Sequence, residues 1–121
     1  GVGRGSRPRR SPAHAAVTVR FRTEPEASAE LDAAVVWYER HRTGLGGEFL
    51  AAIDDALDFI ARWPRAATLA SGVPADLGVR RAPVRRFPYH VVYLEAAGTI
   101  RILAFAHDRR LPGYWRSRAM E

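Results

Sequence analysis

Two apolar segments in the last third of the chain constrain its fold more than any other feature. Residues 87–94 (FPYHVVYL) and 100–106 (IRILAFA) are rich in aromatic and aliphatic side chains, and the short stretch EAAG lies between them. This composition is typical of β-strands, and a short turn with glycine joins antiparallel neighbours. Because both segments are apolar on both faces, we expect two central strands, with helices covering one face of the sheet.

Two helices are predicted ahead of these strands. Apolar residues recur at helical spacing in a first run, Ala27, Leu31, Ala34, Val35 and Tyr38, and in a second run, Phe49, Ile53, Ala56, Leu57 and Ile60. We expect one helix from Pro25 to Arg42 and another from the TGLGG stretch to Trp63, where Pro64 ends it. Such a short break between two helices predicts a helical hairpin.

The ends of the first helix also carry local signals. Thr23 is the expected N-cap, and Glu26, three residues later, completes the pattern of a capping box. Gly44 is the expected residue just beyond the end of the helix, where glycine adopts a left-handed conformation easily.

Two further strands complete the predicted order. Residues 17–21 (VTVRF) alternate apolar and polar side chains, whereas residues 79–84 (VRRAPV) give a weaker signal because Pro83 interrupts them. We expect residues 65–78 to be irregular and one helical turn to follow Pro112. The predicted fold is therefore α+β: a β-α-α-β-β-β order, with a helical hairpin packed on a small, mostly antiparallel sheet.

Length and composition limit the class of protein. The chain has 121 residues, enough for one domain over residues 17–121, and residues 1–16 have the composition of a disordered basic tail. No apolar run is long enough to span a membrane, and cysteine is absent, which fits a cytoplasmic protein. Residues 79–121 carry nine arginines and three acidic residues, and this excess suggests an anionic partner.

Arginine is the only basic side chain besides histidine, and four arginines lie close together. Two interpretations of Arg80, Arg81, Arg85 and Arg86 stay open. Their guanidinium groups could bind phosphate or a partner protein, together with Arg110. Alternatively, they are the charges that prevent an edge strand from pairing with other chains.

Histidines and aromatic residues near the strands are the candidates for chemistry. His90 lies within an apolar strand and is expected to be a hydrogen-bonded core residue, whereas His107 ends the last strand and could transfer protons near neutral pH. Tyr114 and Trp115 could stack on nucleic-acid bases or fold back as a cap on the core. The acidic residues of the second helix look like a solvated face, so we expect no metal site and no cofactor.

In this order and spacing, three stretches resemble one protein family. They are WYER with GLGGEFLAAIDDALDFIARWP in the helical hairpin, VRRAPVRRFPYHVVY in the middle strands, and IRILAFAHDRRLPGYWRSR at the end. The chain resembles toxins of the RelE/ParE superfamily of bacterial type II toxin–antitoxin systems, from about Val19 to Arg118. The resemblance implies a growth-inhibiting, cytoplasmic toxin of the plasmid-stabilisation kind, with a cognate antitoxin that wraps around it and neutralises it.

The superfamily contains two activities, and the resemblance leaves both open. RelE-like members cut mRNA on the ribosome without a metal, and their functional positions fall here near Arg80 and Arg81, on His90, near Asp108 or Arg109, and on Tyr114. For that activity His107, Arg109 and Tyr114 are the candidate catalytic residues. ParE-like members inhibit DNA gyrase non-catalytically, and this is the activity that we expect. A third alternative is an inactive homologue that only binds its antitoxin.

Overall fold

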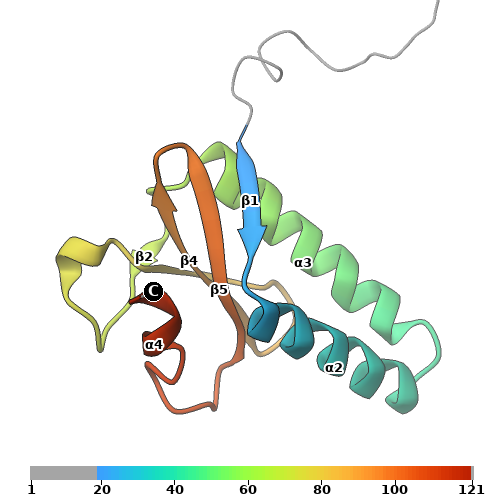
Figure 1. Cartoon of the computed structure of the whole chain (residues 1–121). Helices are drawn as coiled ribbons and strands as arrows, with labels where there is room; N and C mark the ends of the chain where they lie inside the picture. The colour runs from blue at the N-terminus through green and yellow to red at the C-terminus, as the bar shows by residue number, and fades with distance from the viewer. Residues whose placement is uncertain (1–18, 121) are drawn as a thin grey trace, which may run out of the picture.

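The computed structural model describes residues 19–120 (Figure 1). Its elements follow the order β1 (Arg20–Thr23), α2 (Pro25–His41), α3 (Leu45–Arg62), β2 (Thr68–Leu69), the 3₁₀ turn η1 (Ala75–Leu77), β3 (Arg80–Pro83), β4 (Tyr89–Ala96), β5 (Thr99–His107) and α4 (Arg116–Ala119). The predicted order is confirmed, with two additions: β2 and η1 lie in the stretch that we expected to be irregular. The tail that we predicted for residues 1–16 lies outside the described residues.

The sheet has the strand order β1-β5-β4-β3-β2, so β4 and β5 are central as predicted. β5 pairs with β4 in antiparallel and with β1 in parallel orientation. Ala97 and Gly98 form the two-residue turn between β4 and β5, and both have positive φ angles, 53° and 78°. Such angles identify the tight turn that matches the twist of a hairpin.

The beginning of α2 differs from the prediction. Glu24, not Thr23, is the N-cap residue, and it makes no side-chain capping bond. Thr23 is the last residue of β1 and pairs with Ile102 of β5. Because Thr23 belongs to the sheet, it does not act as the N-cap that a capping box requires. The side chain of Glu24 is buried instead against Arg101, which donates a hydrogen bond of 3.0 Å to it.

The break between the helices also differs from the prediction. Gly44, with a φ of 90°, is the N-cap of α3 and not the residue that ends α2. The carboxylate of Glu39 on α2 accepts the backbone N–H groups of Gly44 at 2.9 Å and Gly46 at 3.0 Å. Glu39 of α2 thus places a negative charge at the N-terminus of α3, where the helix dipole is positive.

Two hydrophobic cores lie on opposite faces of the sheet. The first, between the sheet and the helices α2 and α3, includes Phe49, Ile53, Ile60, Tyr93 and Ile102. The second includes Val79, Val92, Leu103, Trp115 and Ala119, so the C-terminal segment and residues 70–79 cover the other face. Trp115 is only 3% exposed, and it therefore caps the core, which was one of the two predicted alternatives. Figure 1 shows α4 on the side of the sheet away from the long helices.

Among residues 19–120, no helix combines the length and the apolar character needed to cross a membrane.

Candidate functional site

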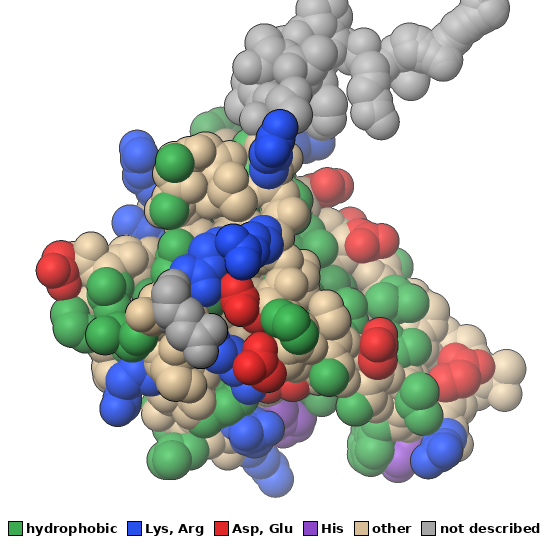
Figure 2. Space-filling model, viewed as in Figure 1, with side chains coloured by type: hydrophobic (Ala, Val, Ile, Leu, Met, Phe, Trp, Pro, Cys, Tyr) green, Lys and Arg blue, Asp and Glu red, His purple; other side chains and the backbone are tan. Residues whose placement is uncertain are grey.

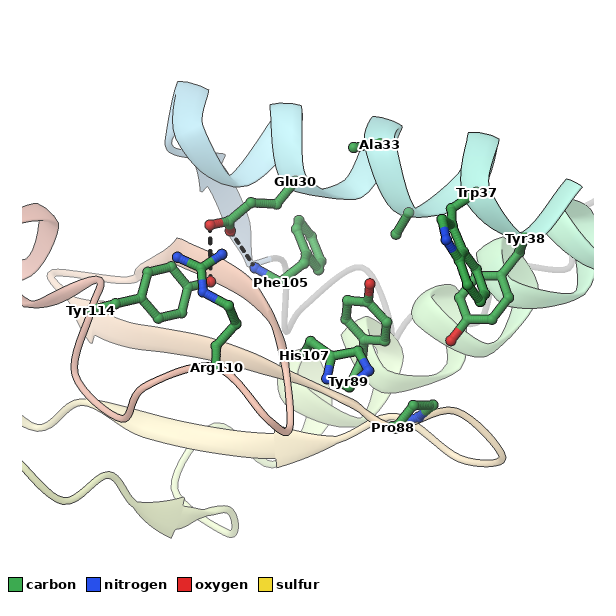
Figure 3. A pocket seen from close by; sticks show the side chains of 11 residues that line it. Glu30, Ala33, Trp37, Tyr38, Pro88, Tyr89, Phe105, His107, Arg110 and Tyr114 are labelled. Carbon is green, nitrogen blue, oxygen red and sulfur yellow. Dashed lines mark hydrogen bonds between the residues drawn. The ribbon is translucent and has the colours of Figure 1, made fainter. Parts of the chain in front are cut away.

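A groove with a volume of about 780 Å³ lies between α2 and the ends of β4 and β5. We call it the groove. Its walls are mainly apolar, and Figure 3 shows the side chains from α2 facing those of the two strands. The lining residues are Glu30, Ala33, Ala34, Trp37, Tyr38, Pro88, Tyr89, Phe105, His107, Arg110 and Tyr114.

The sequence creates the groove by placing small side chains in the middle of α2. Ala33 and Ala34 leave space between Trp37 at one end and Tyr114 at the other. The partner strand of β5 also ends early: β1 pairs with β5 only as far as Ile102. Beyond that point the outer edge of β5 is not paired with a strand, and side chains of Glu30 and Arg118 bond to its backbone instead.

Glu30 closes one end of the groove by joining three parts of the chain. Its carboxylate accepts the backbone N–H of Phe105 at 3.1 Å and the hydroxyl of Tyr114 at 2.9 Å. It also forms an ion pair of 3.1 Å with Arg118, which in turn donates a hydrogen bond to the carbonyl of Leu103. These contacts fix the C-terminal segment on α2 and β5.

Tyr114 is held in its protonated form. Burial raises the pKa of its phenol far above the usual value, and the hydrogen bond to Glu30 raises the pKa further. The guanidinium carbon of Arg110 lies 3.9 Å from the centre of the Tyr114 ring, a cation–π contact. The hydroxyl of Tyr114 thus has a partner already and carries its proton over the physiological range.

The other two candidate catalytic residues lie in different surroundings. His107 ends β5 and lines the groove, and its Nδ1 accepts the backbone N–H of Arg109 at 3.0 Å. That bond places the proton of a neutral ring on Nε2. Arg109 is exposed and does not line the groove, so the structure brings His107 and Tyr114 to one cavity without Arg109.

The four clustered arginines do not form one surface. Arg80 donates to the carbonyl of Ala67 at 2.7 Å, and Arg86 donates to Glu48 at 3.0 Å. Arg81 reaches the other face of the sheet, where its Nη2 lies 3.4 Å from Nδ1 of His90. Arg85 is exposed in the turn after β3. Of the predicted phosphate- or partner-binding arginines, only Arg110 lines the groove.

His90 is a hydrogen-bonded residue of the sheet, as the sequence predicted. Its Nδ1 donates to Oδ1 of Asp108 over 2.8 Å, and its side chain is 12% exposed. This pair ties β4 to the loop after β5. No group of three or more metal-ligating side chains occurs within residues 19–120 that could hold a metal ion.

Sequence reasoning missed Glu30, Trp37 and Tyr89 as residues of the groove. Trp37 gave a usable signal, because this large aromatic residue lies outside the apolar stripe of its helix and is 55% exposed. Glu30 gave none, because it is one of several acidic residues on a helix. Figure 2 shows arginine and acidic side chains intermingled on the face with the C-terminal segment, so neither sign of charge dominates that view.

Comparisons with known proteins agree with the resemblance seen in the sequence. The family model described as the ParE toxin of the type II toxin–antitoxin system parDE matches residues 21–112. A chain from the chromosomal ParDE toxin–antitoxin system of P. aeruginosa has the same fold, with a TM-score of 0.61 at 21% identity, over 75% of this chain and 97% of that one. No curated protein sequence matches significantly. Because the family model spans most of its length, this chain belongs to the ParE toxin family of type II toxin–antitoxin systems.

Proposed function

We propose that this protein is a cytoplasmic toxin that arrests growth by inhibiting DNA gyrase without catalysing a reaction, and that a cognate antitoxin neutralises it. The observation that carries the proposal is the match to the ParE toxin family over residues 21–112. The described chain has no cluster of metal ligands, and the proposal requires none.

The geometry favours inhibition over RNA cleavage. Cleavage needs a proton donor or acceptor within reach of a phosphate held by basic groups. Here the hydroxyl of Tyr114 is bonded to Glu30, and the groove that His107 and Tyr114 line is mainly apolar. Both residues also line a second cavity together with Arg81, but its volume of about 40 Å³ is far smaller than that of the groove and leaves little room for a nucleotide.

The groove supports the antitoxin part of the proposal. An apolar cavity of about 780 Å³ with Trp37 half exposed at its rim suits a segment of another protein. Arg110 at the polar end gives that segment a cation to pair with, so the antitoxin places apolar side chains along α2 and an acidic one beside Arg110.

Two assays on purified protein distinguish the candidate activities. The protein should reduce the supercoiling of relaxed plasmid by gyrase in a dose-dependent way, and an equimolar antitoxin should restore the activity. Primer extension on ribosome-bound mRNA should show no new 5′ ends. If wild type produces new 5′ ends and the His107→Ala variant does not, the protein is an RNase and the gyrase proposal is wrong. Growth arrest that fails to occur when the protein is induced without antitoxin would leave only the inactive homologue.

A further inference from the structure

The last part of α3 exposes two aromatic side chains on one side of the helix. Phe59 is 42% exposed, and Trp63, one turn later, is 61% exposed. They line an open depression of about 230 Å³ together with Asp55, Asp58 and Arg62, and we call these five residues the α3 face. All five belong to α3 or directly follow it, so no other element within residues 19–120 covers this face.

The carboxylates of the α3 face are unpaired. Within residues 19–120, neither Asp55 nor Asp58 forms an ion pair, and neither does the adjacent Asp54. All three are exposed, and Arg62 is the only cation of the face. A guanidinium group is attracted both by the face of an aromatic ring and by a carboxylate. The α3 face therefore suits a segment that carries several arginines.

The amino-acid sequence contains such a segment before β1. Residues 1–16 lie outside the described residues and include no acidic residue. Their arginines are Arg4, Arg7, Arg9 and Arg10. The free carboxylates on α3 and this group of arginines are thus opposite in charge and belong to one chain.

The register of the sheet places the start of β1 at the end where α3 finishes. Arg20 pairs with Thr99 of β5, which pairs with Ala96 of β4. Next to Ala96, Glu95 forms an ion pair of 3.7 Å with Arg65, just after the end of α3. Neighbouring strands lie about 4.8 Å apart, so the chain enters β1 roughly 10 Å across the sheet from the strand that Arg65 contacts. Figure 1 likewise shows the beginning of β1 and the end of α3 at the same end of the sheet.

The length of the intervening chain allows the arginines to reach the α3 face. The stretch from Arg10 to Arg20 extends to about 33 Å, whereas the 18 residues of α3 span about 27 Å. Exposed ion pairs are individually weak, but a short tether gives the arginines a high local concentration and lets several weak contacts add up. The same arginines on a separate molecule lack this advantage.

We propose that the arginines of residues 4–10 bind the α3 face of the same molecule, with guanidinium groups on Asp55 and Asp58 and against the ring of Trp63. The bound segment covers aromatic surface that the rest of the domain leaves exposed. Because the charges lie at the surface, salt screens them and releases the segment. The contact goes beyond the proposed function, because it requires neither gyrase nor antitoxin.

Paramagnetic broadening of NMR signals of the full-length protein tests this proposal. The chain has no cysteine, so Ser11→Cys provides a single attachment point for a nitroxide label beside Arg10. The label should weaken the amide signals of residues 55–63 by about twofold or more, because the tether concentrates it at the face where the arginines bind. Raising the salt concentration from about 50 to about 500 mM should restore most of the signal.

Matched variants separate binding from mere tethering. Asp55→Asn/Asp58→Asn, with the same label, should lose most of the broadening. Asp32→Asn/Asp76→Asn removes the same charge from exposed positions on α2 and η1 and should behave like the labelled protein with its acidic residues intact. Equal broadening in both double variants would overturn the proposal, because the label would then reach α3 through tethering alone.

Two further measurements address the arginines and the source of the segment. Arg7→Gln/Arg9→Gln/Arg10→Gln should reduce the broadening as Asp55→Asn/Asp58→Asn does, and unchanged broadening would contradict the role of the arginines. A spin-labelled chain mixed with a separate isotope-labelled chain should leave the signals of the latter unchanged. Broadening between the two chains would show that the segment binds a second copy, and it would overturn binding within one molecule.

Discussion

At the scale of single residues, Glu30 holds the polar end of the groove together. It is the acceptor for a backbone N–H of β5 and for the hydroxyl of Tyr114, and it is the ion-pair partner of Arg118. Both charged side chains of the pair are less than one-fifth exposed, 18% for Glu30 and 15% for Arg118. The loss of one charge therefore leaves the other poorly solvated.

We expect Glu30→Gln to lower the free energy of unfolding by about 2–3 kcal/mol, because it leaves Arg118 without its anion. Urea unfolding at neutral pH measures the change. Glu26→Gln, an exposed substitution of the same kind one turn earlier on α2, should change the stability by no more than about 0.5 kcal/mol. Equal effects of the two substitutions would contradict the role assigned to Glu30.

Tyr114 gives the protein a sensitivity to alkaline pH. Its pKa is raised in the folded state, so the unfolded chain ionises first, and the stabilisation present below about pH 10 is lost as pH rises towards the folded pKa. Burial also raises the pKa values of Tyr38, Tyr89 and Tyr93. Because the chain has neither lysine nor cysteine, no other type of side chain ionises in that range.

We therefore expect the free energy of unfolding to fall above pH 10 by up to about 1.4 kcal/mol per pH unit for each such tyrosine. Tyr114→Phe should be less stable than wild type at pH 7, where it lacks the bond to Glu30. The difference should shrink as pH rises from 10 to 12. Thermal unfolding at several pH values measures this, and a constant difference across the range would contradict it.

At the scale of elements, the contact between α2 and α3 depends on a glycine. A Cβ at Gly46 would lie 2.9 Å from the carbonyl oxygen of Val35 and 3.0 Å from Oε1 of Glu39. Real Cβ atoms do not approach backbone so closely, and neither helix can move without disturbing the first core. The adjacent Gly47 has nothing within 4 Å of the same position.

This pair of glycines gives opposite predictions for the same substitution. Gly46→Ala should lower the free energy of unfolding by about 1–3 kcal/mol, because it forces the helices apart. Gly47→Ala should raise it by up to about 1 kcal/mol, because alanine is the better helix former. Urea unfolding of both variants measures the two signs, and stabilisation by both would show that the helices can move apart without cost.

The elements also show what sequence patterns can predict. The hairpin of β4 and β5 and the two helices follow from local periodicity and turn residues, and they are found where expected. Thr23 was wrongly predicted as a cap because the deciding interaction, its pairing with Ile102, lies far away in the sequence. The groove could not be predicted for the same reason: Glu30, Trp37 and Tyr89 meet only when α2 lies across β5.

At the scale of the whole molecule, two exposed tryptophans can show where a partner binds. Trp37 is 55% exposed at the rim of the groove, and Trp63 is 61% exposed at the end of α3, outside it. Both are large, accessible aromatic residues, so one is a control for the other.

If the antitoxin occupies the groove, Trp37→Glu should weaken the toxin–antitoxin complex by tenfold or more, about 1.4 kcal/mol. Trp63→Glu should leave the complex unchanged. Isothermal titration calorimetry measures both affinities, and gyrase inhibition by free Trp37→Glu shows whether the variant is still folded and active. A larger loss of affinity with Trp63→Glu than with Trp37→Glu would indicate that the antitoxin binds at the end of α3.

The parallel pairing of β1 with β5 has a consequence for how the protein is made. Arg20 lies beside Thr99, so the first described strand can pair only after the last described strand has left the ribosome. At ~5–20 residues per second, the intervening stretch takes roughly 4–16 s to synthesise. During that interval α2 has no β5 to lie across, and the groove does not exist. Each nascent chain is therefore without a complete groove until β5 has been synthesised, and an antitoxin that is already folded has that time to reach it.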